Sequence, residues 1–395
     1  MIQKSVEEER LLASIKEPEL IEFCQQLVRR KSVNPPGDEL PIAEYVASTL
    51  EWFGLEVELV RHGPNRASVL ARLKGRGTKP GLLYNGHLDT VPVGAQEWIH
   101  DPFSAKTAEG KIWGRGAVDM KGGLAALMAA AKALAGARLP LSGDFIMAAT
   151  AGEETDSQGA MAIAARSDLR PLQAVIIAEP TNNGIYVAEK GALWLELTTH
   201  GKTAHGATPE LGRNAVMMMW KLIGELEKLE IPHEEHPMLG SFTRSINTIA
   251  GGMKTNVVPD NCVVTVDMRT VPGQDHLAIL RRIEDLIEDL GRRIPDFKAS
   301  AKITNDRIPV QTSPEESVVK GVVEIVAEVT GERPVPGGIS YYTDGAAFVP
   351  ALNIPMIICG PGDPKLAHQP NEHVEVSSLV QSARIFTLAA VKLLQ

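Results

Sequence analysis

The chain has 395 residues, a length that predicts two or three domains of ordinary size. Acidic residues outnumber basic ones 49 to 40, which gives a net charge of −9, and this balance argues against a nucleic-acid-binding protein. Three scattered cysteines argue against a disulfide framework, and no apolar run resembles a membrane span or a signal peptide. We therefore expect a globular cytoplasmic protein with neither nucleic-acid nor membrane partners.

Two kinds of pattern alternate along the first part of the chain. Apolar residues at three- and four-residue steps predict helices, and short apolar runs bounded by Gly, Pro or Asp predict buried strands. In chain order the predicted elements are helices at 20–29 and 42–53, strands at 68–73 and 81–84, a helix at 122–135, and strands at 144–150 and 174–178. This alternation indicates an α/β domain with a mostly parallel sheet flanked by helices.

The pattern changes after Thr181. Residues 185–200 alternate between apolar and polar, which is typical of a half-exposed antiparallel strand. The elements predicted next are a helix at 214–229, strands at 245–249 and 262–269, and a helix at 276–290; a helix at 317–329 and a strand at 355–359 then resume the α/β pattern. We therefore expect a discontinuous α/β domain, residues 1–183 and 308–395, interrupted by an inserted α+β domain at 184–307.

Histidine or acidic residues follow four of the predicted parallel strands. In chain order these residues are His87 with Asp89, Glu153 with Glu154, Glu179, and His368, and one more acid, Asp119, precedes the helix at 122–135. Because the ligands of an open α/β sheet gather at the carboxyl ends of its strands, we expect these side chains to converge.

The residue types in this group are typical of a dinuclear metal site. Two imidazoles with several carboxylates and no thiolate suit zinc, cobalt or manganese. Five of the residues, called here the metal-ligand set, are too many for one tetrahedral ion and divide between two ions if Asp119 bridges them: His87, Asp119, Glu154, Glu179 and His368. A two-metal site polarises a carbonyl and activates a water. Asp89 would orient His87 through its other ring nitrogen, and Glu153, left off the metals, would be the general base.

Six segments between about residues 84 and 374 carry a family resemblance. They are GHLDTVPVG, DPFSAKTAEGKIWGRGAVDMKGG, TAGEETDSQGA, AEPT, GKTAHGATPELGRNA and GPGDPKLAHQPNEHV. The chain resembles the dinuclear zinc amidohydrolases and metallopeptidases, which include acetylornithine deacetylase, succinyl-diaminopimelate desuccinylase, aminoacylase and the glutamate-releasing carboxypeptidases. The segments occur in the order found in that family.

The resemblance implies a role for each member of the candidate site. His87, Asp119 and Glu179 would hold one metal ion, and Glu154, His368 and the shared Asp119 would hold the other. Asp89 matches the carboxylate behind the histidine, and Glu153 matches the base that shuttles the proton. The two ions would be zinc, with cobalt or manganese as alternatives. A cis peptide bond is also implied between Asp119 and Met120.

The resemblance also assigns functions to the insert. Residues 184–307 would form a lid that takes part in a homodimer. His205 matches a histidine that reaches a neighbouring active site to stabilise the oxyanion, and Asn256 and Arg269 match residues that hold the substrate carboxylate. The alternatives are that His205 is a turn histidine and that Arg269 makes a structural ion pair. The stretch 337–345 resembles the substrate loop of the family more loosely, which makes Thr343 and Asp344 candidates.

The leading functional prediction is metal-dependent hydrolysis of the amide bond in small N-acyl-amino acids, as in acetylornithine deacetylase. A dinuclear carboxypeptidase or dipeptidase that acts on short peptides is the alternative. Glu189, near the start of the predicted strand at 185–200, would repel a distal carboxylate and so weakens the desuccinylase interpretation, although Lys190 could compensate. A non-catalytic relative predicts eroded ligands, whereas the metal-ligand set is intact. A phosphoesterase would require a phosphate-binding loop or basic cluster, and the sequence has neither.

Overall fold

The computed structural model describes residues 6–395 and divides into two compact units. The first unit contains the chain up to Val187 together with Gln311–Gly338 and Thr343–Gln395, and the second contains Ala188–Val310 and Ile339–Tyr342. The sequence pattern predicted the insertion at 184–307. The role of this insertion as a lid and a dimer contact stays a prediction.

The larger sheet is mixed, with a parallel centre. Its strand order is β1-β2-β6-β3-β7-β15-β8-β13, and β14 also pairs with β8. The central strands β6, β3, β7 and β15 are parallel, whereas β2 and β8 join them antiparallel, as does β1 with β2. The bounds are β1 Glu56–Arg61, β2 Ala67–Leu73, β3 Gly81–His87, β6 Phe145–Thr150, β7 Leu172–Ile177, β8 Tyr186–Glu189, β13 Val310–Gln311, β14 Gly337–Ile339 and β15 Met356–Ile358. The predicted α/β class is confirmed, but the expectation of a mostly parallel sheet holds only for the four central strands.

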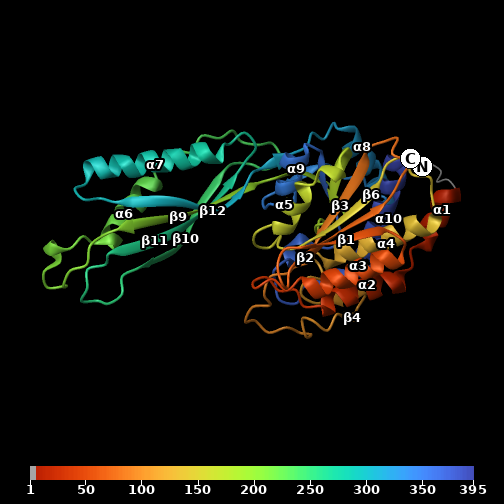
Figure 1. Ribbon diagram of the computed structural model, residues 1–395, viewed down its shortest axis with the longest axis horizontal. Coiled ribbons are helices and arrows are strands. Elements are labelled where there is room, and N and C mark those ends of the chain that lie inside the picture. The colour runs from red at the N-terminus through yellow and green to blue at the C-terminus, as the bar shows by residue number, and fades with distance from the viewer. Residues whose placement is uncertain (1–5) are drawn as a thin grey trace. The chain divides into compact units, whose positions relative to one another are not determined.

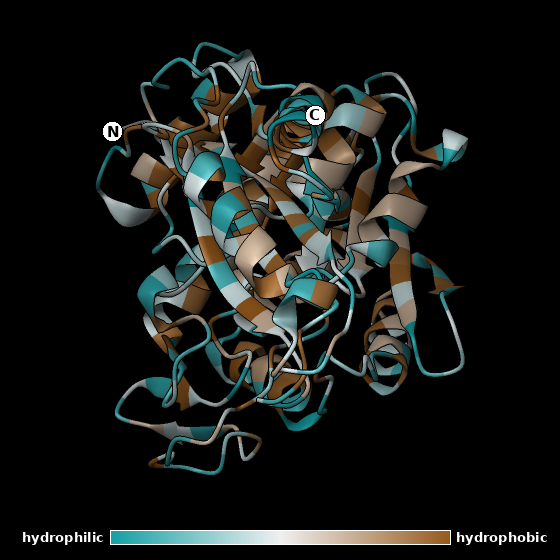
Figure 2. Cartoon of the chain, turned by 90° about the vertical axis from the view of Figure 1, so that its left-hand side faces the viewer, coloured by the Kyte–Doolittle hydropathy of each residue, from teal (hydrophilic) through white to brown (hydrophobic). Residues whose placement is uncertain are grey.

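Helices lie on both sides of this sheet (Figure 1). Helices α1, α2, α4, α8 and α10 pack with one another, and α4 and α10 contact β3, while α5 and α9 pack together and contact β6 and β7. The bounds are α1 Val6–Ser14, α2 Glu17–Arg29, α3 Leu40–Trp52, α4 Lys121–Ala137, α5 Gln158–Ala164, α8 Ser317–Thr330, α9 Gly345–Leu352 and α10 Val376–Leu394. Brown and teal segments alternate along most helices in Figure 2, as expected when one face of each helix is in a core.

Helix α10 is long and apolar enough to cross a membrane by length and composition. It nevertheless packs against α4, α8 and β3, and 61% of its most apolar window is buried. A core helix has the same composition, because all of its faces meet apolar neighbours.

Smaller elements complete the first unit. A short antiparallel sheet has the order β16-β5-β4, formed by β4 Lys106–Ala108, β5 Lys111–Trp113 and β16 His373–Glu375. Single 3₁₀ turns lie at Ser167–Leu169 and Pro364–Leu366 in this unit and at Pro209–Leu211 in the second.

The second unit is a two-layer α+β fold. Its antiparallel sheet has the order β10-β11-β9-β12, and α6 and α7 pack on it and on each other (Figure 1). The bounds are β9 Gly191–His200, β10 Thr243–Gly251, β11 Asn261–Thr270, β12 Ala299–Arg307, α6 Ala215–Leu226 and α7 His276–Arg293. Side chains of Asn214 and Asp275 cap α6 and α7 by accepting backbone N–H groups of the first turn.

The predicted single strand at 185–200 is wrong, because the structure divides it into two strands. β8 pairs with β15 in the larger sheet, whereas β9 pairs with β11 and β12 in the smaller one. At the start of β9, Gly191 approaches its neighbours so closely that a Cβ there would lie 2.5 Å from the Arg307 carbonyl oxygen. The alternating pattern continues through this change of sheet and therefore cannot reveal it.

Candidate metal centre

The parallel pairing of the central strands brings their carboxyl ends to one level. His87 at the end of β3 is opposite Thr150 at the end of β6, and Asn85 is opposite Ile177 at the end of β7. The segments that follow β6 and β7 carry Glu153, Glu154 and Glu179. The strand register therefore places these side chains at one edge of the sheet, as predicted from the sequence.

Helix α4 brings Asp119 to the same edge. Asp119 lies two residues before α4, and the peptide bond between Asp119 and Met120 is cis, as the resemblance implied. Nearly all of α4 is buried. A Cβ on Gly123 in its first turn would lie 2.0 Å from the Ala178 carbonyl oxygen. Only glycine permits this approach between the start of α4 and the residue before Glu179.

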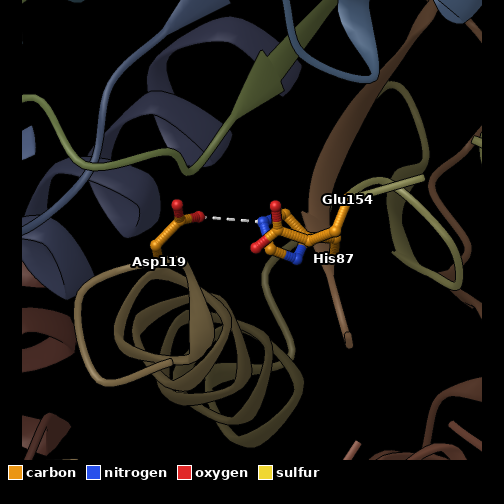
Figure 3. Close-up of side chains that lie close together, drawn as sticks. All are labelled: His87, Asp119 and Glu154. Carbon is orange, nitrogen blue, oxygen red and sulfur yellow. Dashed lines mark hydrogen bonds and ion pairs between the residues drawn. The ribbon is translucent and has the colours of Figure 1, made fainter. Parts of the chain in front are cut away.

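The structure brings the metal-ligand set together, with Asp119 at its centre. His87 Nε2 lies 3.0 Å from Asp119 Oδ1 and 3.5 Å from Glu179 Oε1. His368 Nε2 lies 3.3 Å from Asp119 Oδ2 and 3.0 Å from Glu154 Oε2. Each oxygen of Asp119 thus faces a different imidazole, which is the arrangement that a bridging carboxylate requires. Figure 3 shows the side chains of His87, Asp119 and Glu154 directed toward one another.

The donor atoms of this group fit divalent ions. Two trios have ligand atoms within 4.8 Å of one another: His87 with Asp119 and Glu154, and His87 with Glu153 and Glu179. Glu154 Oε1 is buried and finds no hydrogen-bond partner within residues 6–395. A buried carboxylate oxygen without a donor is costly unless a cation faces it. The geometry also brings Glu153, which the sequence analysis left off the metals, within reach of an ion.

Burial is the largest influence on the pKa values of the three glutamates at this site. It raises the pKa of Glu153 and of Glu179 well above the usual range, and the neighbouring carboxylates raise both further. The pKa of Glu154 is raised by burial and then by the charge of Asp119. So many carboxylates can all ionise in a buried site only if positive charge is supplied.

In this structure the two imidazoles supply part of that charge. Burial alone would lower the pKa of His87, but its hydrogen bond with Asp119 and the charge of Glu179 raise it well above the usual value. Hydrogen bonds with Asp119 and Glu154 raise the pKa of His368 to about 10. Burial works against ionisation of Asp119, yet both histidines hold its pKa below the usual range. A divalent ion would compete with protons for these same nitrogens.

Asp89 is buried beside His87, but its carboxylate has a different task from the one expected. The nearest partner of His87 Nδ1 is the Asp89 backbone carbonyl at 3.0 Å, and the carboxylate Oδ1 is 3.7 Å away. The carboxylate instead accepts the backbone N–H groups of Gly152, Glu153 and Glu154 at 3.0–3.2 Å. These three donors draw the oxygens away from the ring. Asp89 therefore holds the loop that carries Glu153 and Glu154.

Sequence reasoning missed Asn34, a buried member of this network. Its Nδ2 donates to Asp89 Oδ2 at 2.9 Å and to Thr155 Oγ1 at 2.8 Å. Asn34 stands in a Pro-containing loop after α2, 55 residues before Asp89. Its type and context are those of an ordinary turn residue, so the local sequence carries no signal of this contact.

The candidate Asp344 lies beneath the same strand ends. Its Oδ2 accepts the Thr150 hydroxyl at 2.5 Å and the Asn85 amide at 3.2 Å. Burial raises the pKa of Asp344 to about 6. Both Asp344 and Thr343 are buried. Asp344 thus links the ends of β3 and β6 through these two hydrogen bonds.

Sequence comparison places the chain in a family. The profile of Peptidase family M20/M25/M40 matches residues 83–392. The chain belongs to this family. Its metal-ligand set falls within the matched region, as do Asp89 and Glu153.

Two curated relatives of the M20 chain cover almost its full length. A Staphylococcus aureus protein named "Probable succinyl-diaminopimelate desuccinylase" is 28% identical, with 97% of this chain and 100% of the relative aligned. An acetylornithine deacetylase of Photorhabdus laumondii is 29% identical over 95% of this chain and 97% of the relative. The chain is thus an M20 metallo-hydrolase, and at this identity the relatives do not assign its substrate.

A solved structure has the same fold. The M20 family metallo-carboxypeptidase Sso-CP2 from Sulfolobus solfataricus superimposes with a TM-score of 0.79, covers 94% of this chain and 99% of its own, and is 22% identical. This likeness agrees with the mixed sheet and flanking helices described above.

The three predicted substrate residues of the M20 chain all lie in its second unit. His205 and Asn256 are exposed and neighbouring, because the backbone of His205 bridges to Val257 and Gly206 N–H donates to the Asn256 carbonyl. Arg269 on β11 pairs with Asp267, with Nε 3.0 Å from Oδ1. The guanidinium therefore already has a carboxylate partner. The roles of all three toward substrate stay predictions.

Proposed function

We propose that the protein is an N-acyl-amino-acid deacylase of the acetylornithine deacetylase type. The observation that carries this proposal is the convergence of the metal-ligand set around Asp119, with Glu153 beside it on the loop that Asp89 holds. The named relatives include enzymes that remove succinyl and acetyl groups from amino acids. The products would be a carboxylic acid and a free amino acid.

Two divalent ions would be held by the metal-ligand set, with Asp119 shared between them. Imidazole and carboxylate donors suit zinc best, and cobalt or manganese are alternatives. When bound, the ions would supply polarisation of the scissile carbonyl and a lower pKa for the attacking water. Metal analysis of the purified protein, followed by removal and replacement with each ion, tests the identity of the metal.

Glu153 would move the proton. Its carboxylate would accept a proton from the attacking water and pass it to the nitrogen of the departing amine, so that the carboxylate is restored as the C–N bond breaks. Burial supports this role, because it raises the pKa of Glu153 above the ordinary range and so makes its carboxylate a stronger base. The backbone N–H groups of Gly152 and Glu153 donate hydrogen bonds to the Asp89 carboxylate, and these would hold the loop in position.

His205 would stabilise the oxyanion from the insert. Its Nδ1 accepts the Ala207 N–H at 3.0 Å, so in the neutral ring Nε2 carries the hydrogen. This leaves an exposed N–H donor, which is the group that an oxyanion needs. Asn256, whose backbone is adjacent, and Arg269 would bind the substrate carboxylate.

A carboxypeptidase or dipeptidase that acts on short peptides is the alternative, supported by the likeness to a metallo-carboxypeptidase. The deciding experiment is a panel of N-acetyl, N-formyl and N-succinyl amino acids and dipeptides, assayed with zinc, cobalt and manganese. The proposal expects the acylated amino acids to be the better substrates. Preference for dipeptides would select the alternative. Glu189 is fully buried, and the N-succinyl substrates of the panel test whether it disfavours a distal carboxylate.

A homodimer through the insert is the further part of the proposal. Met217 and Trp220 on one face of α6 are 50% and 67% exposed, and Ile249 on β10 is 59% exposed. β10 is an edge strand of its sheet. A second copy that pairs at this edge would cover both the apolar side chains and the open strand. Light scattering tests the mass of the wild type, and the Trp220→Glu variant should be monomeric.

A cytoplasmic location is also proposed. Cys24, Cys262 and Cys359 are all free and buried, which suits a reducing compartment. Fractionation of the native host, followed by detection of the protein with a specific antibody, tests this location.

A further inference from the structure

Glu372 is fully buried and lies four residues after His368. Its Oε1 accepts the backbone N–H groups of Val118 at 2.9 Å and of Asp119 at 3.0 Å. Its Oε2 accepts Nη1 of Arg115 in a salt bridge. One carboxylate from the His368 segment thus holds the peptide groups that present Asp119. Both oxygens of Glu372 accept hydrogen bonds, and Glu372 belongs to neither group of converging ligand atoms found within residues 6–395.

Arg115 extends this contact to a third segment. Its side chain is 2% exposed. Nη1 also lies 3.4 Å from the carbonyl of Gln369, directly after His368, and Nη2 lies 3.3 Å from the carbonyl of Pro92, in the loop after His87 and Asp89. The buried Arg115–Glu372 pair therefore joins the segments that carry His87, Asp119 and His368.

We propose that Glu372 is a positioning residue for the metal pair. It fixes the peptide of Asp119 so that the two carboxylate oxygens face His87 and His368, and through Arg115 it holds the segments of both histidines against that peptide. Because Asp119 is shared, loss of Glu372 weakens both metal positions. This inference rests on the proposed metal-binding role of the set.

The chain offers a matched control at the opposite end of the sheet. Asp144, just before β6, accepts the Gly75 N–H at 2.9 Å with one oxygen and Arg72 Nη1 at 3.1 Å with the other. The chemistry resembles that of Glu372, namely a carboxylate shared between backbone N–H and guanidinium. The Asp144 carboxylate hydrogen-bonds to Arg72 and Gly75, which lie outside the segments that carry the metal-ligand set. If removing such a carboxylate only lowers the stability of the fold, Asp144→Asn should lose stability as well. Its metal affinity should remain that of the wild type.

The experiment titrates metal-free protein with Co²⁺ and follows heat, visible absorption and hydrogen exchange at the amides of Val118 and Asp119. Folded Glu372→Gln should bind both ions about 10–100-fold more weakly, the range found when groups behind metal ligands are removed. Its Co²⁺ absorption should change and the two amides should exchange faster. Asp144→Asn should bind Co²⁺ like the wild type. Arg115→Lys keeps a positive charge beside Glu372 but loses the planar guanidinium with its several N–H donors. Its affinity for Co²⁺ should therefore fall by a smaller factor than that of Glu372→Gln.

Each outcome decides the inference. Wild-type affinity and absorption in folded Glu372→Gln overturn it, as does an equal loss of affinity in Asp144→Asn. If Glu372→Gln does not fold, Arg115→Lys decides by the same measurements, and unchanged affinity there overturns the inference. A wild-type protein that does not bind two Co²⁺ ions contradicts the proposed function itself, which distinguishes that failure from a failure of Glu372 alone.

Discussion

The Asp89 carboxylate holds the loop that carries Glu153, the proposed base, by accepting three of its backbone N–H groups. Replacing Asp89 with Asn removes one of two acceptor oxygens that serve the N–H groups of residues 152–154 and turns an amide toward them. We expect metal affinity to fall about 10–100-fold, measured by Co²⁺ titration. Asn34→Ala removes only the outer donor to the same carboxylate and should have a smaller effect. Equal losses in the two variants would contradict this ranking.

Glu153 should be needed for turnover but not for metal binding. Glu153→Gln keeps the size of the side chain and the backbone hydrogen bond to Asp89, but it removes the group that carries the proton. We expect kcat to fall about 100-fold or more with metal content unchanged. Turnover on the best substrate of the panel, with metal analysis of the same sample, checks this. A simultaneous loss of metal would assign Glu153 to the ions, which the trio with His87 and Glu179 allows.

The pKa values of the site predict how metal-free protein responds to pH. The pKa of His368 is raised to about 10 by Asp119 and Glu154, so the folded protein retains a proton there that the unfolded chain releases near its ordinary pKa of 6.5. This contribution to stability is complete below about pH 6.5 and is lost as the pH rises toward 10. The raised pKa values of Glu153 and Glu179 act in the same direction.

We therefore expect the melting temperature of metal-free protein to fall as the pH is raised from 6.5 to 9. Metal-loaded protein should show a smaller fall, because the ions replace the protons. Calorimetry of both forms checks the difference. His368→Gln in metal-free form should flatten the curve, and a slope unchanged by this substitution would contradict the assignment to His368.

At the scale of elements, Gly123 sets the distance between helix α4 and the segment that carries Glu179. A Cβ there would lie 2.0 Å from the Ala178 carbonyl, whereas a Cβ on Gly136, in the same helix, meets nothing within 4 Å. Gly123→Ala should lower the free energy of unfolding by about 1–3 kcal/mol, and Gly136→Ala should raise it by about 0.5–1 kcal/mol. Urea denaturation of both variants measures the contrast. Similar shifts in the two variants would mean that α4 adjusts freely.

The elements that the sequence predicted well are those with buried apolar runs. β3, β6 and β7 carry unbroken or nearly unbroken burial, and their patterns predicted both the strands and the residues that follow them. β1 and β12 were missed although their burial alternates, because both are edge strands with charged or polar exposed residues and so lack a continuous apolar run. The division between β8 and β9 was missed because strand periodicity does not report which sheet a strand joins.

At the scale of the whole molecule, the convergence of the proposed metal-ligand set was predictable from the sequence, and its supporting residues were not. All members of the set except Asp119 follow predicted strands, so chain order and the rule for parallel sheets bring these four together, whereas Asp119 comes from the segment before α4. Glu372 is 253 residues from Asp119, and Asn34 is 121 residues from Thr155. Neither contact has a local pattern, because each depends on how segments outside the strands pack. A sequence pattern therefore points to the proposed ligands, whereas the residues that hold them become visible only in the folded structure.

The dimer and the role of His205 can be tested together. If His205 of one subunit completes the site of the other, a mixed dimer of His205→Ala and Glu153→Ala subunits has one complete site. In that site, Glu153 comes from the His205→Ala subunit and His205 comes from its partner. The other site lacks both groups. If His205 instead serves its own subunit, each site of the mixed dimer lacks one group and neither works.

Mixing the two inactive variants in equal amounts should therefore restore about a quarter of wild-type turnover, since half of the dimers are mixed and each has one complete site. Native mass spectrometry establishes that subunits have exchanged. The matched control mixes Glu153→Ala with Glu153→Gln subunits, which cannot complement each other in either arrangement. Activity that stays at the level of the separate variants after full exchange would assign His205 to its own subunit, and a wild type that is monomeric in solution would contradict the shared site altogether.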